Sequence, residues 1–454
     1  MFDKTTNTVI VMGLARSGLA AARLLCQRGY DVIVNDQKQP DPNNAEVSSL
    51  KDLGARFVFG GHPLELLEQP IKFIVKNPGI PYRVPFVAAA MEQGIPIYTE
   101  IEVASWYAQG QITAITGSNG KTTTTTLVGE ILAAAELNPL VAGNIGTAFS
   151  AVADETVPSQ PVVLEVSSFQ LLGTERFHPH VAAILNLFPA HLDYHGDFDA
   201  YFDAKWKIFA NLDQGDYAVL NFNDDRLRKR AGEVQAPIFW FSTGPLPDSL
   251  EGVYVERDVI MVRMSGNSIP VMPVSDVALP GSHNLQNALA ATAVAWLVGA
   301  RESAVRQVLT SFRGVEHRLE FVETKGGVLY YNDSKSTNPT AALQALRSFS
   351  QPIVWIAGGL DRRDDYSVLD DVVKARVKTA VLYGQTAADL VEFCRGCDVE
   401  QVVRVDNLDD AVRTAANAAV EGDVVLLSPA CASWDMFTSF EERGRMFKEV
   451  VHRL

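Results

Sequence analysis

One stretch of the chain has the residue types and the spacing of a phosphate-binding loop. A β-branched run from Ile112 to Thr116 leads into Gly117-Ser118-Asn119-Gly120-Lys121-Thr122, and the following residues can continue as a helix. The glycines allow successive backbone N–H groups to face one anion, and the amino end of the helix adds positive potential. Lys121 supplies a compact charge for the β- and γ-phosphates of a nucleotide, and the Thr122 hydroxyl is placed to ligate Mg²⁺. We therefore predict a nucleoside-triphosphate site.

The spacing of this loop differs from the standard one, because G-x-x-G-K-T is shorter than G-x-x-x-x-G-K-S/T. An ordinary glycine turn before a core helix is the alternative. The preceding strand and the Gly-Lys-Thr order favour the nucleotide site.

An acidic residue is predicted close to this loop. Glu165 comes at the end of a strand expected over 161–166. Nucleotide-hydrolysing folds hold Mg²⁺ with such a strand-end carboxylate. A carboxylate exposed to solvent is the alternative, but Ser167-Ser168 after the valine-rich run favours a site.

A histidine-containing segment follows the strand expected over 182–187. His191, Asp193 and His195 lie within five residues and could ligate a metal. No second histidine or cysteine pair completes a zinc set, so we favour a hard metal or a substrate role for one histidine. The helix expected over 199–209 then presents Lys205 and Lys207, and we expect Lys207 to be a solvated surface lysine.

The elements around these residues indicate alternating strands and helices. At the start, a strand over 8–12, the turn Gly13-Leu14-Ala15-Arg16-Ser17-Gly18, a helix over 19–27 and a strand ending before Asp36 resemble a dinucleotide-binding βαβ unit. Because Ala15 replaces the middle glycine of the motif, the sequence supports NAD binding only weakly. Binding of another nucleotide, or a turn with a purely structural role, is at least as well supported.

Two more strands complete this first segment. The strand over 73–76 ends at Asn77-Pro78-Gly79, a turn at a carboxyl end of the kind where open α/β sheets bind ligands. We expect the last strand over 95–99 and a linker over 99–110.

A strongly apolar helix is expected after Gly281. Asn284 and Asn287 share one of its faces, and we expect one to cap the helix and the other to meet a base or a phosphate. The apolar run 288–300 is too short to span a bilayer.

The third segment repeats the alternation of strands and helices. Strands are predicted over 328–332, 353–357, 380–383 and 424–427. Polar loops follow three of these strands and predict a ligand crevice at the sheet edge: 333–338, 358–362 and 428–433. The fold prediction is therefore α/β with three domains: a Rossmann-like domain (1–99), a central P-loop-type ATPase domain with a mostly parallel sheet (100–314) and a C-terminal doubly wound Rossmann-like domain (315–454).

Composition narrows the class of function. The 454 residues carry a net charge of −15, which disfavours binding to nucleic acid or to anionic membranes. The amino end lacks a signal-peptide pattern, and four cysteines form no disulfide framework, so we expect a cytoplasmic protein. Cys394 and Cys397 are expected to be free thiols, with a redox motif as the alternative.

Motifs along essentially the whole chain resemble those of the Mur ligases, the ATP-dependent amide-forming enzymes of bacterial peptidoglycan synthesis. They are G-S-N-G-K-T at 117–122, H-N-x-x-N at 283–287, H-R at 317–318 and N-D-S-K-x-T-N at 332–338, together with segments 143–146, 164–171 and 428–433. The resemblance implies a UDP-binding domain, an ATPase domain and a domain that brings the amino acid.

The activity implied by the resemblance is a ligation driven by ATP. A carboxylate is a poor acyl donor, and phosphorylation converts it into an acyl phosphate that an amine can displace. The implied substrates are UDP-N-acetylmuramoyl-L-alanine and glutamate, and the implied cofactors are ATP and two Mg²⁺ ions. We expect a monomer that binds no nucleic acid and inserts into no membrane, and whose domains close over the substrates.

The resemblance also implies roles for individual residues. The ATP contacts would be Gly117, Ser118, Asn119, Gly120, Lys121, Thr122, Thr123, Asn287, Arg318 and Asp333. The UDP-substrate contacts would be Arg16, Ser17, Asp36, Asn77, Gly79 and Asn144. The glutamate contacts would be His191, Lys335, Thr337, Arg362, Ser433 and Phe440. The catalytic residues would be Lys121, Glu165, His191 and Lys205.

The metal ligands implied by the resemblance are Thr122 and Glu165 for one ion and His191 and Lys205 for the other. A cationic lysine cannot bind Mg²⁺, and the matching lysine of the family is carbamylated, so we predict a carbamate on Lys205. Some members carry lysine where this chain has Arg362, which can grip a carboxylate with two hydrogen bonds.

Three other classes of protein share parts of the pattern. A sister ligase or a folylpolyglutamate-type synthetase would keep the ATP motifs and change the outer domains. Ala15 and the loop at Lys121 disfavour an NAD-dependent oxidoreductase. The presence of all four implied metal ligands disfavours a non-catalytic nucleotide-binding regulator. The residues alone do not distinguish D- from L-glutamate.

Overall fold

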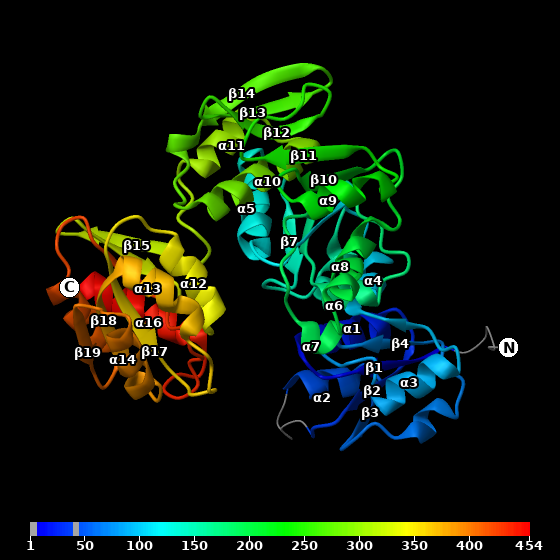
Figure 1. Ribbon diagram of the computed structural model, residues 1–454. Coiled ribbons are helices and arrows are strands. Elements are labelled where there is room, and N and C mark those ends of the chain that lie inside the picture. The colour runs from blue at the N-terminus through cyan, green and yellow to red at the C-terminus, as the bar shows by residue number, and fades with distance from the viewer. Residues whose placement is uncertain (1–6, 40–44) are drawn as a thin grey trace. The chain divides into compact units, whose positions relative to one another are not determined.

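The computed structural model describes residues 7–39 and 45–454. It divides into two compact units, Met1–Asp276 with Gln286–Thr310, and Val277–Leu285 with Ser311–Leu454. The first unit holds two sheets and the second holds one, so the protein is α/β with three sheet-based domains, as predicted (Figure 1). The predicted domain boundaries after residues 99 and 314 stay a prediction.

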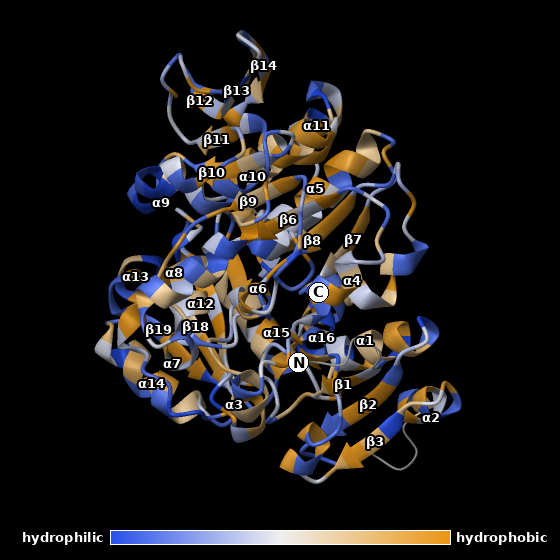
Figure 2. Cartoon of the chain, turned by 90° about the vertical axis from the view of Figure 1, so that its right-hand side faces the viewer, coloured by the Kyte–Doolittle hydropathy of each residue, from blue (hydrophilic) through white to orange (hydrophobic). Residues whose placement is uncertain are grey.

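The first sheet is parallel, with strand order β3-β2-β1-β4-β5. Its strands are β1 (Thr8–Met12), β2 (Asp31–Asp36), β3 (Arg56–Phe59), β4 (Phe73–Lys76) and β5 (Ile97–Tyr98), and its helices are α1 (Arg16–Gln27), α2 (Ala45–Asp52) and α3 (Pro85–Glu92). The strand order reverses between β1 and β4, so a crevice is expected at their carboxyl ends. Strand β3 is mostly apolar, whereas α9 (Asp225–Arg230) is strongly hydrophilic (Figure 2).

The predicted linker over 99–110 is wrong, because helix α4 (Glu100–Ser105) occupies half of it. Its two glutamates are buried, against the usual preference of charged side chains for solvent. The Glu102 carboxylate accepts hydrogen bonds from backbone N–H groups of Glu175, Arg176 and Phe177. These partners lie 73 to 75 residues away in sequence, so local pattern could not reveal the helix.

The second sheet has nine strands in the order β14-β13-β12-β11-β10-β9-β6-β8-β7. The strands are β6 (Ile112–Thr116), β7 (Leu140–Gly143), β8 (Val162–Glu165), β9 (Val181–Ile184), β10 (Tyr217–Asn221), β11 (Ile238–Ser242), β12 (Gly252–Glu256), β13 (Val259–Met264) and β14 (Asn267–Pro273). Strands β6 to β12 pair in parallel, and β13 and β14 add an antiparallel extension. The fully buried β6 lies between β8 and β9 at the centre of the parallel part.

The described part of this region has seven α-helices. They are α5 (Lys121–Ala134), α6 (Ser168–Leu172), α7 (Leu192–His195), α8 (Phe198–Trp206), α9, α10 (Ser282–Val298) and α11 (Glu302–Leu309). Asn284 is inside the first turn of α10, where its amide donates to the Pro280 carbonyl rather than capping the helix. No helix among residues 7–39 and 45–454 is long and apolar enough to cross a membrane.

The third sheet has the order β15-β16-β20-β17-β18-β19 and is doubly wound, as predicted. Its strands are β15 (Glu320–Lys325), β16 (Val328–Asn332), β17 (Ile353–Gly358), β18 (Val377–Tyr383), β19 (Gln401–Arg404) and β20 (Val424–Leu427), and its helices are α12 (Pro339–Arg347), α13 (Asp370–Arg376), α14 (Ala387–Gly396), α15 (Leu408–Ala418) and α16 (Phe440–Arg453). Separate apolar cores cover the two faces of the sheet. Only β15 pairs antiparallel.

Candidate active site around the phosphate loop

The predicted phosphate loop connects β6 to α5, as the sequence indicates. Gly120 precedes the helix with a left-handed φ of 80°. A Cβ at this position would lie 2.1 Å from the Asn287 Oδ1 atom, so both backbone angle and space require glycine. The loop therefore brings Asn287 of α10 next to the phosphate-binding residues. Thr123 lies in the first turn of α5, which begins at Lys121.

Side chains after β9 hold the loop in place. The Asn119 backbone N–H donates to Asn186 Oδ1 at 2.9 Å, and the Asn186 amide returns a hydrogen bond of 3.1 Å to the Asn119 carbonyl. The Ser118 hydroxyl accepts from the Phe188 N–H at 2.9 Å and lies 3.0 Å from the Tyr201 hydroxyl. Asn186 and Tyr201 carry no sequence motif and were missed by sequence reasoning.

Two lysine side chains meet at one backbone carbonyl of the loop. Lys121 Nζ donates to the Gly117 carbonyl at 3.0 Å, and Lys205 Nζ donates to the same oxygen at 2.8 Å. Lys205 is only 2 % exposed and also contacts Thr116 Oγ1 at 3.4 Å. Because two ammonium groups this close would repel each other, the arrangement disfavours simultaneous protonation of both lysines.

The charge state of Lys205 follows from these surroundings. Burial lowers its pKa well below the ordinary value, the nearby charge of Lys121 lowers it further, and Glu165 acts in the opposite direction. The neutral amine is therefore much more populated here than at a surface lysine. A neutral amine can act as a nucleophile, whereas an ammonium group cannot.

Glu165 offers an oxygen without a protein partner beside the loop. It ends β8, is 2 % exposed and is paired in register with Ile115 of β6. Its Oε1 atom accepts from Asn144 Nδ2 at 2.8 Å, while Oε2 is buried and has no hydrogen-bond partner among the described residues. A buried, unpaired carboxylate oxygen is costly unless a cation binds it, so Glu165 and the buried Thr122 fit a magnesium ion.

The two histidines of the segment after β9 both pack against the ring of Phe169. His191 is exposed, precedes α7 with a left-handed φ of 55°, and packs edge-on against Phe169 at 5.0 Å. His195 stacks on the same ring at 5.2 Å, and its Nε2 atom lies 3.0 Å from Ser168 Oγ. The side chain of Asp193 lies outside the described part of the structure.

The expectation that Lys207 is a solvated surface lysine is wrong. Its Nζ atom donates to the Leu172 and Thr174 carbonyls at 2.8 and 3.0 Å, at the end of α6. Burial lowers its pKa. The short 3₁₀ turn after α8 directs Lys207 inward, which periodicity along the sequence could not indicate.

Residues predicted to contact the UDP moiety gather at the carboxyl ends of β1, β2 and β4. The Asn77 amide donates to Ser17 Oγ at 3.2 Å, and the Gly79 N–H donates to Asn77 Oδ1 at 3.0 Å. Asp36 accepts from the Leu14 N–H at 2.6 Å. A cavity of about 280 Å³ lies beside it, lined by Leu14, Ala15, Leu19, Asp36, Lys38, Gln39 and Val47.

Two contacts join this region to the loops that carry the central site. The Arg16 guanidinium donates to the Gly146 carbonyl, just after Asn144. Lys76, at the end of β4, is completely buried, and its Nζ donates to the Ile80 and Asn77 carbonyls at 2.7 and 3.2 Å and to the Tyr194 hydroxyl of α7 at 3.4 Å. Sequence reasoning missed Lys76, although a single lysine in an apolar strand was a visible signal.

The second unit gathers the remaining predicted residues at the carboxyl ends of β16, β17 and β20. Lys335 Nζ lies 3.8 Å from the centre of the Phe440 ring, and the Arg362 guanidinium lies 4.8 Å from the exposed Trp434 ring. The Thr337 N–H donates to the Lys335 carbonyl at 2.8 Å.

Asp333 and Ser433 are the buried members of this set. The Asp333 carboxylate accepts from the Ser336 and Ser428 hydroxyls and from the Leu319 N–H. Burial raises its pKa to about 6, and the charge of Arg318 opposes that shift.

Arg443 of α16 is a further residue that sequence reasoning missed. Its guanidinium is fully buried and donates to Ser334 Oγ at 3.0 Å, to the Ser334 carbonyl at 2.8 Å and to the Cys431 carbonyl at 3.1 Å. It thereby ties the loop after β16 to the loop after β20.

Comparison with known proteins identifies the family of the chain. Family models match the chain as a Mur ligase MurD-like N-terminal domain at 7–99, a Mur ligase middle domain at 115–295 and a Mur ligase glutamate ligase domain at 317–431. The chain belongs to the Mur ligase family. A UDP-N-acetylmuramoylalanine–D-glutamate ligase of Geobacillus kaustophilus is 48 % identical over 98 % of this chain and 97 % of its own, and one of Bacillus mycoides is 47 % identical over 99 % and 98 %.

Solved structures of other Mur ligases share the fold. MurF from Acinetobacter baumannii aligns with a TM-score of 0.60 at 22 % identity, over 97 % of this chain and 93 % of that one. UDP-N-acetylmuramate-alanine ligase MurC from Thermotoga maritima aligns with a TM-score of 0.58 at 20 % identity, over 98 % and 99 %.

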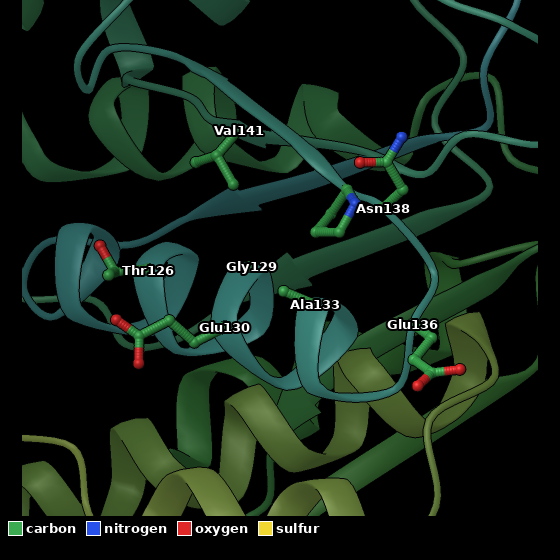
Figure 3. A pocket seen from close by; sticks show the side chains of 8 residues that line it. Thr126, Gly129, Glu130, Ala133, Glu136, Asn138 and Val141 are labelled. Carbon is green, nitrogen blue, oxygen red and sulfur yellow. The ribbon is translucent and has the colours of Figure 1, made fainter.

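A separate cavity of about 540 Å³ lies along the later turns of α5 and strand β7 of this Mur ligase (Figure 3). Glu130 and Glu136 border it, together with the half-exposed Val141. Burial raises the pKa of Glu130. None of the residues predicted to bind the nucleotide or the substrates lines this cavity.

Proposed function

We propose that this chain uses ATP to join the carboxylate of UDP-N-acetylmuramoyl-L-alanine to the amino group of D-glutamate, in peptidoglycan precursor synthesis. The close relatives over the full chain, which bear that activity in their names, support it. The observation that carries it chemically is the pair of lysines on the Gly117 carbonyl beside the unpaired Glu165 oxygen.

The reaction proceeds through an acyl phosphate. An oxygen of the acceptor carboxylate attacks the γ-phosphorus of ATP, and the bond to the ADP oxygen breaks. The glutamate nitrogen then attacks the acyl carbon, loses a proton, and inorganic phosphate leaves with the original carboxylate oxygen. Positioning and charge neutralisation provide most of the catalysis in such phosphoryl transfers.

The residues of the loop orient ATP. Lys121 neutralises the phosphates, and the backbone from Gly117 to Gly120 with Ser118, Asn119 and Thr123 cradles them. Asn287 and, on the second unit, Arg318 and Asp333 are the proposed contacts to the rest of the nucleotide. Because Asp333 already accepts three hydrogen bonds, we propose that it also fixes the loop that carries its neighbours.

Thr122 and Glu165 would hold one magnesium ion, and His191 with a carbamylated Lys205 the second. These ions would neutralise the charge that develops on the transferred phosphoryl group. The carbamate forms when the neutral Lys205 amine attacks the carbon of CO₂ and loses a proton. The pKa of Lys205, which burial lowers, supports this modification, because it increases the fraction of neutral amine.

Arg16, Ser17, Asp36, Asn77, Gly79 and Asn144 are proposed to bind the UDP-linked substrate. For glutamate we propose His191, Lys335, Thr337, Arg362, Ser433 and Phe440. Glutamate has two carboxylates, and Lys335 and Arg362 offer two cations held against aromatic rings. We further propose that the enzyme works as a monomer in the cytoplasm; its four free cysteines fit a reducing compartment.

Phosphate release tests this function directly. Release should require ATP, the UDP-linked acceptor and D-glutamate together, and L-glutamate should not replace the D-enantiomer. If the acceptor carboxylate is labelled with ¹⁸O, one labelled oxygen should appear in the released phosphate. Unlabelled phosphate would exclude the acyl-phosphate route, and no ATP turnover with either enantiomer would exclude the ligase itself.

A further inference from the structure

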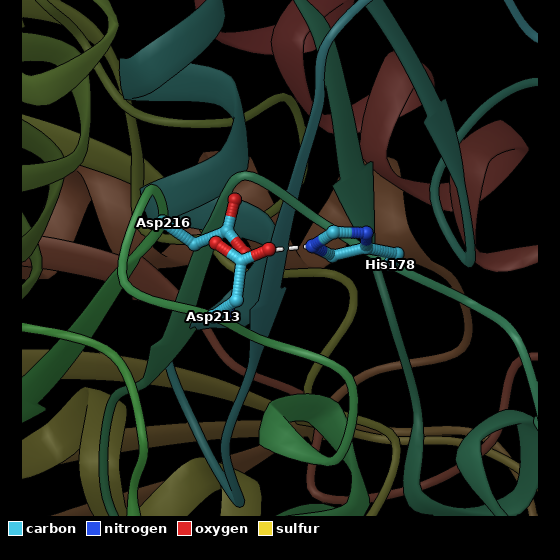
Figure 4. Close-up of side chains that lie close together, drawn as sticks. All are labelled: His178, Asp213 and Asp216. Atoms are coloured by element: carbon cyan, nitrogen blue, oxygen red, sulfur yellow. Dashed lines mark hydrogen bonds and ion pairs between the residues drawn. The ribbon is translucent and has the colours of Figure 1, made fainter.

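A cluster of histidines and aspartates lies at the edge of the central sheet opposite the phosphate loop. His178 and His180 immediately precede β9, and Asp213 and Asp216 immediately precede β10 (Figure 4). The phosphate loop follows the carboxyl end of β6, which runs parallel to β9. The cluster is therefore at the amino ends of the strands, away from the groups assigned to catalysis.

Asp216 is the buried centre of the cluster. It is 1 % exposed, and its two carboxylate oxygens each lie 2.6 Å from an imidazole nitrogen, Oδ2 from His178 Nε2 and Oδ1 from His180 Nδ1. The Asp213 N–H also donates to Oδ2 at 2.8 Å. These contacts fix both the position and the orientation of the carboxylate.

Asp213 adds a second carboxylate beside the first. One ligand atom each from His178, Asp213 and Asp216 lies within 4.8 Å of the others. Figure 4 shows the carboxylates of Asp213 and Asp216 next to each other and facing the His178 ring. Two adjacent carboxylates repel each other, and a divalent cation among the three ligand atoms would relieve that repulsion.

We propose that His178, Asp213 and Asp216 form a binding site for a divalent transition metal of the Zn²⁺ class. One imidazole nitrogen with two carboxylate oxygens and a water gives the four ligands that zinc takes, at about 2.0–2.2 Å each. An imidazole ligand favours zinc over the harder Mg²⁺. The metal replaces the proton now shared between His178 and Asp216.

His180 acts as a positioning residue in this site. Its ring holds the far oxygen of Asp216 and leaves the near oxygen directed at His178 and Asp213. Metal sites commonly use such a partner behind a ligating group, and its loss weakens binding about 10–100-fold. Since His178 is 42 % exposed, the metal can enter from solvent.

The site connects two segments that start neighbouring strands. The backbone of His180 already bonds Ile112 of β6 and Tyr217 of β10. A bound metal would therefore stabilise the amino edge of the ATPase sheet without touching substrates. We expect Zn²⁺ to raise the unfolding temperature of the full-length protein and to leave ligation unchanged in rate.

Titration of the metal-free, nucleotide-free full-length protein with Co²⁺ tests the proposal, because four-coordinate Co²⁺ has visible absorption bands and reports on zinc sites. We expect one Co²⁺ to bind with these bands and Zn²⁺ to displace it. His180→Asn should weaken Co²⁺ binding about 10–100-fold, and Asp213→Asn, which removes a ligand, should weaken it more.

The exposed position of Asp213 makes this variant informative, because it should fold and ligate like the wild type. Glu165→Gln is the matched control: a band that depends on Glu165 and not on Asp213 would place the ion in the active site and overturn the proposal. Equal Co²⁺ binding by the wild type and by Asp213→Asn, or no absorption band at all, would overturn it as well.

Discussion

The first compact unit buries two lysines, Lys76 and Lys205, and surrounds them differently. Neither forms an ion pair with a carboxylate in the part of the chain that the structure describes. The Lys76 ammonium has three backbone carbonyls and the Tyr194 hydroxyl within 3.5 Å, and it lies 4.5 Å from the centre of the Tyr82 ring. Lys205 has one carbonyl, the more distant Thr116 hydroxyl and the Tyr201 ring at 4.8 Å.

The difference shows how surroundings decide the charge of a buried amine. An ammonium group has three hydrogens to donate, and the acceptors around Lys76 can bind all of them. Burial lowers the pKa of Lys76 to about 8, so the charge survives at neutral pH. Burial lowers the pKa of Lys205 well below the ordinary value, and the nearby charge of Lys121 lowers it further. Lys76 is therefore suited to hold loops together, and Lys205 to react.

The largest expected effect comes from removing Lys205. Both Lys205→Ala and Lys205→Arg should lower kcat/KM by at least about a hundredfold, since neither side chain can carry a carbamate that binds a metal. Lys229→Ala, a change at an exposed lysine of α9, is the control and should keep near-normal activity. Full activity of Lys205→Ala, measured by phosphate release, would remove Lys205 from the mechanism.

Arg443 of the second unit resembles Lys76, because it is a buried cation whose N–H groups donate to nearby acceptors. Arg443→Met should destabilise the protein by about 3 kcal/mol, because it leaves the Ser334 and Cys431 carbonyls unsatisfied. It should also raise the KM for glutamate more than that for ATP. The exposed Arg445→Met on the same helix should change the unfolding temperature little, and equal effects of the two variants would contradict this assignment.

Lys76→Met should destabilise the protein by about 2 kcal/mol, because three partly buried carbonyls lose their donor. The released loop should also raise the KM for the UDP-linked substrate, with little change in the KM for glutamate. Thermal unfolding and steady-state kinetics measure these effects, with the exposed Lys72→Met as control. A variant as stable as the wild type would show that the charge of Lys76 is not needed.

The smallest effect is a dependence on pH. The pKa of Lys76 in the folded protein, about 8, lies below its ordinary value of 10.5. At a pH between these two values, Lys76 is more protonated in the unfolded chain than in the folded protein. The contribution of Lys76 to the free energy of unfolding therefore rises with pH. The unfolding temperature of the wild type minus that of Lys76→Met should therefore grow from pH 7.5 to pH 10. A constant difference would mean that Lys76 has no depressed pKa.

Much of the fold could be predicted from the sequence, because the elements concerned carry local signals. Strands β1, β4, β6, β16 and β20 have the predicted bounds. The phosphate loop was also found, since glycine, lysine and threonine must stand at fixed spacing to bind phosphate.

What could not be predicted depends on partners far away in sequence. The sequence predicts a linker where α4 lies, because the N–H groups that donate to the Glu102 carboxylate come from residues 175–177. Lys76 and Arg443 donate mainly to backbone carbonyls. Because every residue has a backbone carbonyl, no residue type in the sequence marks these partners. Lys207 was placed in solvent because its acceptors at the end of α6 cannot be read from its own helix.

Detection of a carbamate on Lys205 tests the central claim most directly. After incubation of the full-length enzyme with ¹³C-bicarbonate and Mg²⁺, carbon-13 NMR should show one slowly exchanging carbamate resonance in the wild type and in Lys76→Met. The resonance should be absent from Lys205→Arg. No resonance in an active wild-type preparation, or the same resonance in Lys205→Arg, would contradict the account.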